Sequence, residues 1–589
     1  MKNILTLFLF LFLFSFQTFG QGNGWEWQNP LPTGNNLIDI HVFDGQNAIV
    51  VGGMGTILRT DDGGNSWQIQ YSETTDWLRS VYFADTYNGW VVGHGGKILH
   101  TTNNGEVWQN QSSGTNSDLY AIHFIDSQIG WVVGENGTIR RTSNGGISWQ
   151  NQISGSSRHL LAVHFTDTQN GWVVGEAGTI LKTSNGGNSW QLAIKGSTQF
   201  ESVYFLDATT GWAVGSGGRI MKTSNGGSYW QNQSSGTINR LLFVYFNDGQ
   251  KGWALGEGGT ILKTNNGGVN WLIQSSGITN YLFSGCFKDG QNGWAVGVCG
   301  MILKTNNGGS SWQILGKGTL SNLASIQILN NQVGWTVGIK GSILNTTNGG
   351  RTWKSQNTDI TKNQKAIYFI DNQNGWVVGD SGTILKTSNG GTSWQNQVSG
   401  TTNNLLSVHF LDNQIGWAVG QLGAIIKTSN GGVNWTNQNS GTIKNFHSVF
   451  FWNMLAGWAV GQNGTILKTT NGGITWEDES IVSENTLYQI QFIDSLTGWS
   501  VGDYGTILKT NNGGSSWEGQ NSGVGNDFYS VHFTNPQNGW VVGTSGVILR
   551  TNDGGNSWQE QSSGTMQRLR SIYFSDVQNG WVSGDNGTI

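Results

Sequence analysis

Residues 171–191 read GWVVGEAGTILKTSNGGNSWQ, and this stretch decides the fold of the whole chain. It contains two short apolar runs, and turn residues rich in glycine follow each of them. Short apolar runs bounded by glycine and asparagine are typical of β-strands joined by tight turns. The apolar residues do not recur at the spacing of a helical face. The stretch therefore predicts a β-hairpin.

The pattern of this stretch recurs along the chain with a constant period. The tryptophans of Gly-Trp pairs run from Trp90 to Trp581 at intervals of 41 residues, with one interval of 40. A second tryptophan series with the same period runs from Trp67 to Trp558. Within residues 404–440 we expect four strands, a to d, in the runs LLSVHFL, GWAVG, AIIKT and VNWTNQ. A four-stranded unit of about 40 residues is one blade of a β-propeller, which predicts an all-β chain of fourteen blades.

The turn between strands c and d carries the most specific motif, as in the run from Thr183 to Trp190. Asparagine tolerates left-handed backbone, and glycine adopts a positive φ without steric cost, as a tight hairpin requires. This motif resembles the Asp-box of the bacterial sialidase (BNR) repeats, and residues 171–191 resemble the photosystem II stability and assembly factor-like propellers. The resemblance covers residues 25–589 and implies one four-stranded blade for each repeat. It also implies that the Asp-box is structural and lies on the face away from the usual binding surface.

The ends of the chain predict how the blades are grouped. Residues 25–28 fit a strand d with no strand before it, and the segment at Trp312 fits the same position in the middle of the chain. We therefore expect tandem β-propellers of seven blades each, the first over residues 21–308 and the second over residues 309–589. A division into six and eight blades stays open. The last repeat stops at Ile589 before a counterpart of Leu-Lys-Thr, so either its last strand is short or the C-terminus is truncated.

The N-terminal residues and the composition predict where the protein works. Lys2 is followed by an apolar run from Ile4 to Phe16, which fits a signal peptide over residues 1–20 and is too short to span a membrane. We expect the protein to be secreted, periplasmic or on the cell surface. Charged residues make up 11% of the chain and the net charge is −5, which gives no basis for binding nucleic acid. The rest of the sequence predicts no membrane span.

The sequence offers no catalytic group, no cofactor site and no metal site. Sialidases that resemble this fold use an arginine triad, whereas the arginines of this chain fall at unlike positions of the repeat. Glycosidases of the xyloglucanase type place carboxylates on long loops, and no repeat here carries an inserted loop. Asp62 and Asp553 are the only acids at the Asp-box position, where the other eleven copies carry asparagine, and this argues against calcium. Cys286 and Cys299 are expected to be two thiols, with a disulfide as the alternative.

One position of strand a holds a histidine or a tyrosine in most repeats. The histidines at this position are His41, His123, His164, His409 and His532. Because other repeats place glutamine, cysteine or phenylalanine there, we expect a half-buried packing position. A ligand site that lines the central channel is the alternative.

The turn between strands b and c varies most among the repeats. We expect it to share one face of the propeller with the loops between strand d and the next strand a. A constant scaffold with one variable rim is how repeat proteins build binding surfaces, and drift on a solvated rim is the alternative. The candidate binding rim consists of Trp77, His94, Glu135, Glu176 and Glu257.

Together these features predict an exported, non-enzymatic β-propeller scaffold that binds a protein partner or assists assembly at the cell envelope. The first alternative is a glycan-binding propeller or a glycoside hydrolase of the sialidase or xyloglucanase type, with a surface glycan as the ligand. The second alternative is an architectural spacer at the cell surface.

Overall fold

The computed structural model describes residues 32–194, 196–287, 291–315, 321–330, 332–350, 352–356, 358, 360–481 and 484–589. The predicted signal peptide over residues 1–20 and the predicted strand at residues 25–28 lie outside the described residues.

Every regular element of the described residues is a β-strand or a single-turn 3-10 helix. The strands form thirteen four-stranded antiparallel sheets and one two-stranded sheet at the end of the chain. Each sheet is one repeat, and its strands pair in chain order, as in β17 (Phe200–Phe205), β18 (Gly211–Gly215), β19 (Arg219–Thr223) and β20 (Gln231–Gln233). The prediction of an all-β chain of repeated blades is confirmed.

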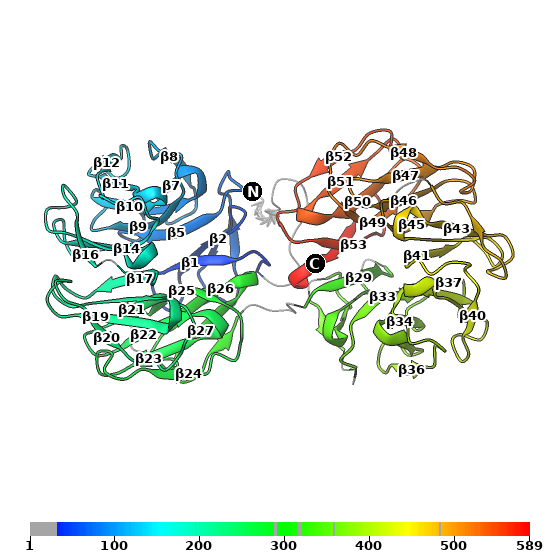
Figure 1. Cartoon of the computed structure of the whole chain (residues 1–589), viewed down its shortest axis with the longest axis horizontal. Helices are drawn as coiled ribbons and strands as arrows, with labels where there is room; N and C mark the ends of the chain where they lie inside the picture. The colour runs from blue at the N-terminus through cyan, green and yellow to red at the C-terminus, as the bar shows by residue number, and fades with distance from the viewer. Residues whose placement is uncertain are drawn as a thin grey trace, which may run out of the picture.

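The sheets fall into two groups of seven, and within each group the first strand of one sheet contacts the first strand of the next. We call these first strands the inner strands. In the first group of sheets they are β1 (Leu37–Val42), β5 (Leu78–Phe83), β9 (Leu119–Phe124), β13 (Leu160–Phe165), β17, β21 (Leu241–Phe246) and β25 (Leu282–Phe287). In the second group they are β29 (Leu323–Ile328), β33 (Gln364–Phe369), β37 (Leu405–Phe410), β41 (Phe446–Phe451), β45 (Leu487–Phe492), β49 (Phe528–Phe533) and β53 (Leu569–Phe574). In addition, β25 contacts β1 and β53 contacts β29 (Figure 1).

Hydrogen bonds join the first and last inner strands of each group. Ser284 Oγ on β25 donates to Asp39 Oδ1 on β1 at 2.6 Å, and the backbone N–H of Ile326 on β29 donates to Ser571 Oγ on β53 at 3.1 Å. Asp39 also accepts a hydrogen bond from Ser80 Oγ on β5 at 2.9 Å. Burial raises the pKa of Asp39 above its ordinary value, although these hydrogen bonds oppose the shift. One carboxylate thus connects three inner strands.

The segment at Trp312 does not begin the second half of the chain, and that prediction is wrong. Residues Gln313–Ile314 form β28, which pairs with β27 (Ile302–Thr305) and places Ile314 opposite Leu303. The reason is the ring of Trp312, which packs edge-on against Phe287 of the same blade at 5.9 Å between ring centroids. The expected boundary between residues 308 and 309 therefore falls inside the hairpin β27–β28.

In twelve of the sheets the second strand carries a buried tryptophan that packs between two blades. In β14 (Gly171–Gly175), the ring of Trp172 is fully buried and stacks on Phe205 of the next blade at 3.6 Å between centroids. Its Nε1 donates a hydrogen bond to the carbonyl of Gly226 in the Asp-box turn of that blade at 3.1 Å. Trp230, from the same turn, then packs edge-on against Phe205. The same fully buried tryptophan occurs at Trp90, Trp131, Trp172, Trp212, Trp253, Trp294, Trp335, Trp376, Trp417, Trp458, Trp499 and Trp540.

The Asp-box turn is held together by its own side chains. Asn185 Oδ1 accepts hydrogen bonds from Thr183 Oγ1 at 2.9 Å and from the backbone N–H of Ser189 at 3.0 Å. Gly187 has a φ of 86°, and a Cβ there would lie 2.0 Å from Gln152 Oε1 of the preceding blade. The turn therefore requires glycine for its backbone and for its contact between blades, which fits the structural role that the resemblance implied.

We predict that Trp417→Ala lowers the free energy of unfolding by about 3–5 kcal/mol, because it removes a buried ring. The ring stacks on Phe451 at 3.5 Å, and its Nε1 donates to the carbonyl of Gly472 at 3.3 Å. Denaturant titration followed by tryptophan fluorescence measures the loss. Trp452→Ala is the control, since that side chain is 41% exposed. An equal cost for the two variants would contradict the prediction.

We also predict that Asp39 makes stability depend on pH. Because its pKa is raised in the folded state, folding binds a proton, and stability falls as pH rises from about 4 through the folded-state pKa. Asp39→Ser, which supplies the residue that Ser80 and Ser202 provide in other blades, removes this contribution. Thermal melts of both proteins should give a stability difference, variant minus wild type, that grows with pH. A difference that is constant or shrinks with pH would contradict the assignment.

Candidate functional site

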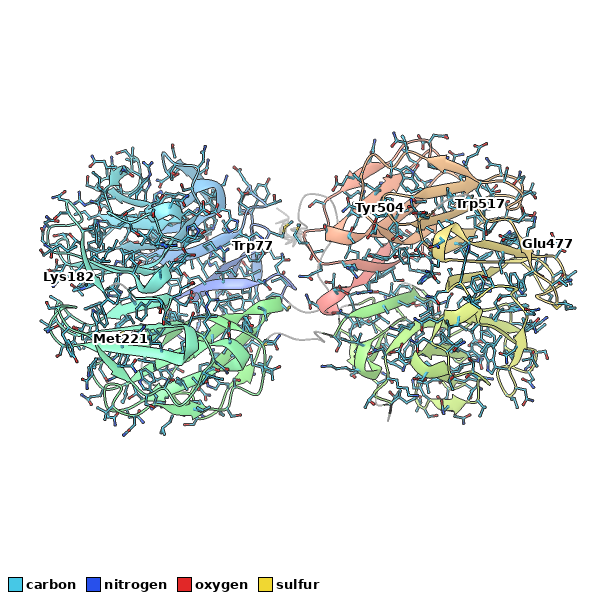
Figure 2. All side chains as sticks on the ribbon, in the orientation of Figure 1. Trp77, Lys182, Met221, Glu477, Tyr504 and Trp517 are labelled. Atoms are coloured by element: carbon cyan, nitrogen blue, oxygen red, sulfur yellow. The ribbon has the colours of Figure 1, made fainter. Side chains whose placement is uncertain are left out.

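The turns between the second and third strands lie beside the loops that enter the inner strands. The backbone N–H of His94 donates to the carbonyl of Trp77 at 2.9 Å, and that of Glu135 donates to the carbonyl of Asp118 at 2.9 Å. We call the surface made by these turns and loops the b–c face. The structure thus brings Trp77, in a loop before an inner strand, together with His94, in a turn between second and third strands. The sequence predicted that these turns and loops share one face. Figure 2 labels Trp77 in the first group and Tyr504, which stands in a turn between second and third strands, in the second group.

The backbone of the b–c face restricts which residues it accepts. Gly93 ends β6 (Gly89–Gly93), and a Cβ there would lie 2.2 Å from the carbonyl oxygen of Trp77. The second inner residue of each turn adopts a positive φ, which is 54° at Leu422 and 53° at Tyr504. Both inner residues nevertheless vary widely among the repeats, and His94, Glu135, Glu176 and Glu257 stand at the first of the two positions.

The second residue of each inner strand also belongs to this face. In every blade the register shifts between the first and third residues of the inner strand, for example between Leu78 and Ser80. A β-bulge of this kind leaves one residue unpaired and redirects its side chain. We call this residue the bulge position. Its members in the first group are Ile38, Arg79, Tyr120, Leu161, Glu201, Leu242 and Phe283, and those in the second are Ala324, Lys365, Leu406, His447, Tyr488, Tyr529 and Arg570.

Trp77 and His94 form a cluster with two residues of the bulge position. The rings of Trp77 and His94 stack with 6.1 Å between centroids and 16° between planes. The guanidinium of Arg79 lies 5.3 Å from the Trp77 ring and 5.7 Å from the Tyr120 ring. Arg79 Nε donates a hydrogen bond to His94 Nε2 at 3.0 Å. Burial first, and then the charge of Arg79, lowers the pKa of His94, so the imidazole is neutral at neutral pH.

The three glutamates of the candidate rim differ in what they contact. Glu135 Oε2 accepts a hydrogen bond from the backbone N–H of Asp118 at 3.4 Å, and Glu176 Oε2 accepts one from His159 at 3.3 Å. Glu257 is half-buried, and its charge helps to raise the pKa of nearby Glu201 after the larger effect of burial. Two of the three therefore cap their own loops in addition to facing solvent.

The second group carries an aromatic arc that the sequence analysis missed. The rings of His447 and Tyr488 lie 5.1 Å apart, and those of Tyr488 and Tyr529 lie 4.9 Å apart. The guanidinium of Arg568 lies 5.3 Å from the Tyr529 ring. Burial and a hydrogen bond to Asp503 raise the pKa of Tyr488. Counting residues from the first apolar residue of each strand a, rather than from the turns, would have found this arc.

The histidine position of strand a forms a row of ring contacts across the inner strands. Centroids lie 4.8 Å apart for His123 and His164 and 5.0 Å apart for His164 and Tyr204. These side chains are half-buried, as expected, and burial lowers the pKa of His164 to about 4. Among the described residues no group of three or more histidines, cysteines or acids could hold a metal ion. Cys286 and Cys299, both described, are not joined by a disulfide.

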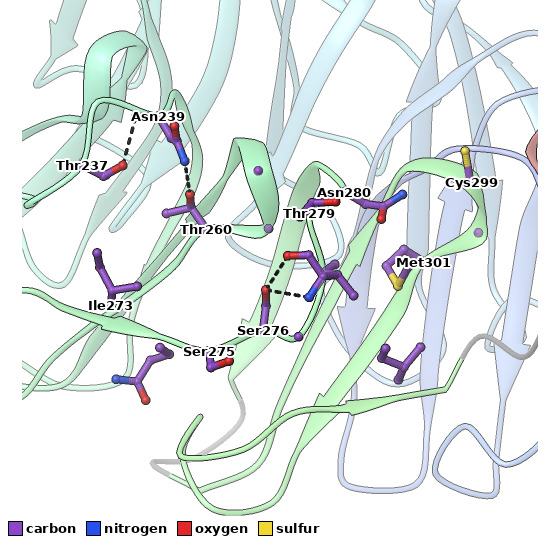
Figure 3. Close-up of a pocket in the computed structure, with 17 residues that line it drawn as sticks. Thr237, Asn239, Thr260, Ile273, Ser275, Ser276, Thr279, Asn280, Cys299 and Met301 are labelled. Carbon is purple, nitrogen blue, oxygen red and sulfur yellow. Dashed lines mark hydrogen bonds between the residues drawn. The ribbon is translucent and has the colours of Figure 1, made fainter. Parts of the chain in front are cut away.

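One cavity opens among the turns and loops of the b–c face. It has a volume of about 810 Å3 and is lined by Asn239, Thr260, Ser276, Cys299 and Met301 among others (Figure 3). None of the described residues that line it is charged.

One family model matches the chain in a series of segments, most of which overlap. A family model described as the photosynthesis system II assembly factor YCF48 matches residues 20–114, 106–193, 154–237, 192–271, 230–319, 310–401, 353–441, 397–482 and 520–589. The chain belongs to this family. No curated protein matches the chain. Within this YCF48-family chain, no helix of the described residues is both long and apolar enough to cross a membrane.

Solved structures share the architecture. An ancestral GH74 enzyme has a TM-score of 0.67 at 14% identity and covers 96% of this chain and 98% of its own. The GH74 xyloglucanase from Xanthomonas campestris has a TM-score of 0.64 at 11% identity, over 96% of this chain and 99% of its own. A structure of YCF48 bound to a D1 peptide is 23% identical over 46% of this chain and 92% of its own, with a TM-score of 0.41. At these identities the two GH74 similarities concern the fold alone.

We predict that Asn389→Asp leaves the melting temperature within about 1 °C of the wild type and creates no response to calcium. Asn389 Oδ1 accepts hydrogen bonds from Thr387 Oγ1 and from the backbone N–H of Ser393, both at 3.0 Å. An aspartate serves the same turn without difficulty, since Asp62 accepts the two equivalent bonds at 2.9 Å. Melting curves with and without calcium make the measurement. A calcium-dependent rise in either protein would contradict a purely structural Asp-box.

Proposed function

We propose that this chain is an exported, non-enzymatic scaffold that binds a protein partner, or assists its assembly, through the b–c face. One observation carries the proposal: a constant scaffold presents different side chains on this face from repeat to repeat. Trp77, Arg79 and Tyr120 place aromatic and cationic groups there in the first group, and Tyr488 and Tyr529 do so in the second. Tyrosine, tryptophan and arginine are the residues that dominate interface energetics.

The carboxylates of the b–c face support binding rather than hydrolysis. Glycoside hydrolysis needs two carboxyl groups about 5 to 9.5 Å apart that are available to the substrate. Glu135 and Glu176 accept hydrogen bonds from backbone N–H groups. Glu201 is paired with Arg240, whose Nε donates to it at 2.7 Å. The connections between the strands of the described residues are also short, and none of these described connections is a long loop that brings further acids to this face. A glycan ligand or a glycosidase stays the alternative.

We further propose that the two groups of sheets are two seven-bladed propeller domains. The contacts of β25 with β1 and of β53 with β29 support this division. In this arrangement the first domain ends after β28, and the second begins at β29. Export to the envelope or beyond rests on residues 1–20 of the sequence.

The proposal predicts that changes on the b–c face weaken partner capture without unfolding the protein. The test variant combines Trp77→Ser, Glu135→Gln, Glu176→Gln and Glu257→Gln, because glutamine keeps the acceptor oxygens that cap the loops. We expect a melting temperature close to that of the wild type and a clear loss of the protein captured from the native cell envelope. Quantitative mass spectrometry of the captured proteins is the measurement.

A matched control lies in the Asp-box turns. Ile147 and Ile474 are 81% and 73% exposed, and changing both to serine should leave capture intact. Loss of capture in this control, with capture retained in the b–c variant, would place the binding surface in the Asp-box turns. Capture of no protein by the wild type would favour the architectural spacer. Turnover of a glycan by the purified protein would contradict the non-enzymatic proposal.

A further inference from the structure

Charged side chains at the bulge position are paired within the chain in three of four cases. The charged residues there are Arg79, Glu201, Lys365 and Arg570. Three of them lie in ion pairs with a residue of opposite charge, and these pairs are Glu201–Arg240, Lys365–Asp380 and Arg570–Asp585. No ion pair among the described residues includes Arg79. This guanidinium is therefore the exception of its class.

The cause is a single residue of the neighbouring turn. Fifteen residues after Lys365 and after Arg570 the chain carries an aspartate, which pairs with the cation. The residue at the same distance from Arg79 is His94, which accepts a hydrogen bond from Arg79 Nε at 3.0 Å. Neutral imidazole satisfies that donor but supplies no negative charge. The positive charge of Arg79 therefore stays uncompensated at this turn.

Asp118 is the nearest acid, and its carboxylate is engaged elsewhere. Its Oδ1 accepts a hydrogen bond from the backbone N–H of Gly95 at 2.8 Å, and its Oδ2 lies 3.7 Å from His94 Nε2. Its charge reaches Arg79 only at longer range, where it helps the arginine stay protonated against burial. The charge of Asp118 thus partly offsets the positive charge of Arg79, but Asp118 accepts no hydrogen bond from the Arg79 guanidinium.

The guanidinium is held ready in one orientation. Its central carbon lies 5.3 Å from the centre of the Trp77 ring and 5.7 Å from that of the Tyr120 ring, and a cation over an aromatic face is attracted to it. The bond from Nε to His94 fixes the plane of the group. The four N–H donors on the two terminal nitrogens make no hydrogen bond to the described residues. A half-buried arginine that is fixed but unpaired is arranged for a ligand that is not part of this chain.

We propose that Arg79, Trp77, His94 and Tyr120 form a binding site for a carboxylate group of a partner peptide. The terminal N–H groups of guanidinium match the two oxygens of a carboxylate in a bidentate pair. A carboxylate, with a single negative charge, suits the site better than a phosphate. The negative charges of Asp118, Asp76 and Glu135 lie close enough to raise the pKa of His94, and they would repel a doubly charged ligand more strongly. The choice of a peptide rests on the function proposed above. The carboxylate can be a chain terminus or an acidic side chain, and the experiment separates the two.

The experiment follows the Arg79 Nε–H signal by NMR during titration of the wild-type protein with four probes. The probes are an acetylated polyglycine peptide with a free C-terminus, its C-terminal amide, the same amide with one internal glutamate, and glucuronate. We expect one or both of the acidic peptides to shift the signal and the neutral amide to leave it unchanged. Saturation by glucuronate with no effect of either acidic peptide would overturn the assignment to a peptide carboxylate. No shift with any probe would overturn the site itself.

Two variants sharpen the result. His94→Asp places beside Arg79 the acid that the other two cationic repeats carry, and should weaken binding of the acidic peptide by roughly tenfold or more while the fold is kept. Arg570→Met is the matched control, because that guanidinium is already paired with Asp585, and binding should not change. Unchanged binding in H94D, or equal losses in both variants, would overturn the proposal.

The two proposals can fail separately. If the four-residue b–c variant loses partner capture while H94D captures the partner and binds the peptides as the wild type does, the b–c face binds its partner without this carboxylate site. If acidic peptides bind at Arg79 while the b–c variant retains full capture, the carboxylate site exists, but the partner binds elsewhere.

Discussion

The buried tryptophan of the second strand is the interaction on which the rest of the structure depends. Most of these rings stack on a phenylalanine of the following blade, as Trp417 does on Phe451 at 3.5 Å between centroids. Its indole N–H donates to a carbonyl in the Asp-box turn of that same blade. A lysine of the third strand, Lys427, lies over the ring and donates to the same carbonyl at 2.9 Å. One side chain thus ties a blade to the inner strand and to the outer turn of its neighbour.

Because of this interaction, the sequence is more constrained at one end of a blade than at the other. The Asp-box end keeps threonine, asparagine or aspartate, and the second glycine of the motif, because its backbone lies against the preceding blade. The other end is shaped mainly by the glycine that closes the second strand and by the bulge in the inner strand, and side chains such as Glu135 and Glu176 cap individual loops. Side chains there touch few elements of the scaffold. They can therefore change from blade to blade, and a single chain can present Trp77, Glu201 and Tyr529 at its turns and bulge positions.

The repeat explains what could be predicted from the sequence and what could not. Strands, turns and the structural Asp-box are local features, and a period of 41 residues defines them many times over. The partner of β28 is local as well, since β28 pairs with β27 of the same hairpin. The prediction was wrong because it equated Trp312 with residues 25–28, which fit a strand d with no strand before it, although the run Ile302–Thr305 precedes Trp312. Arg79 was missed because alternation does not hold across a bulge. The capping bonds of Glu135 and Glu176 were missed because they depend on loop geometry.

The charged residues of the b–c face are constrained by their partial burial. A scaffold with 11% charged residues can leave few of them without a partner at a half-buried position, because an unpaired charge removed from water is costly. Lys365 and Arg570 meet this constraint with an aspartate from the adjacent turn. Arg79 meets it differently, since two aromatic faces and one imidazole replace the water that it loses. That environment stabilises the cation without neutralising it, and only such an environment leaves an arginine both ordered and able to pair with a charge from outside the chain.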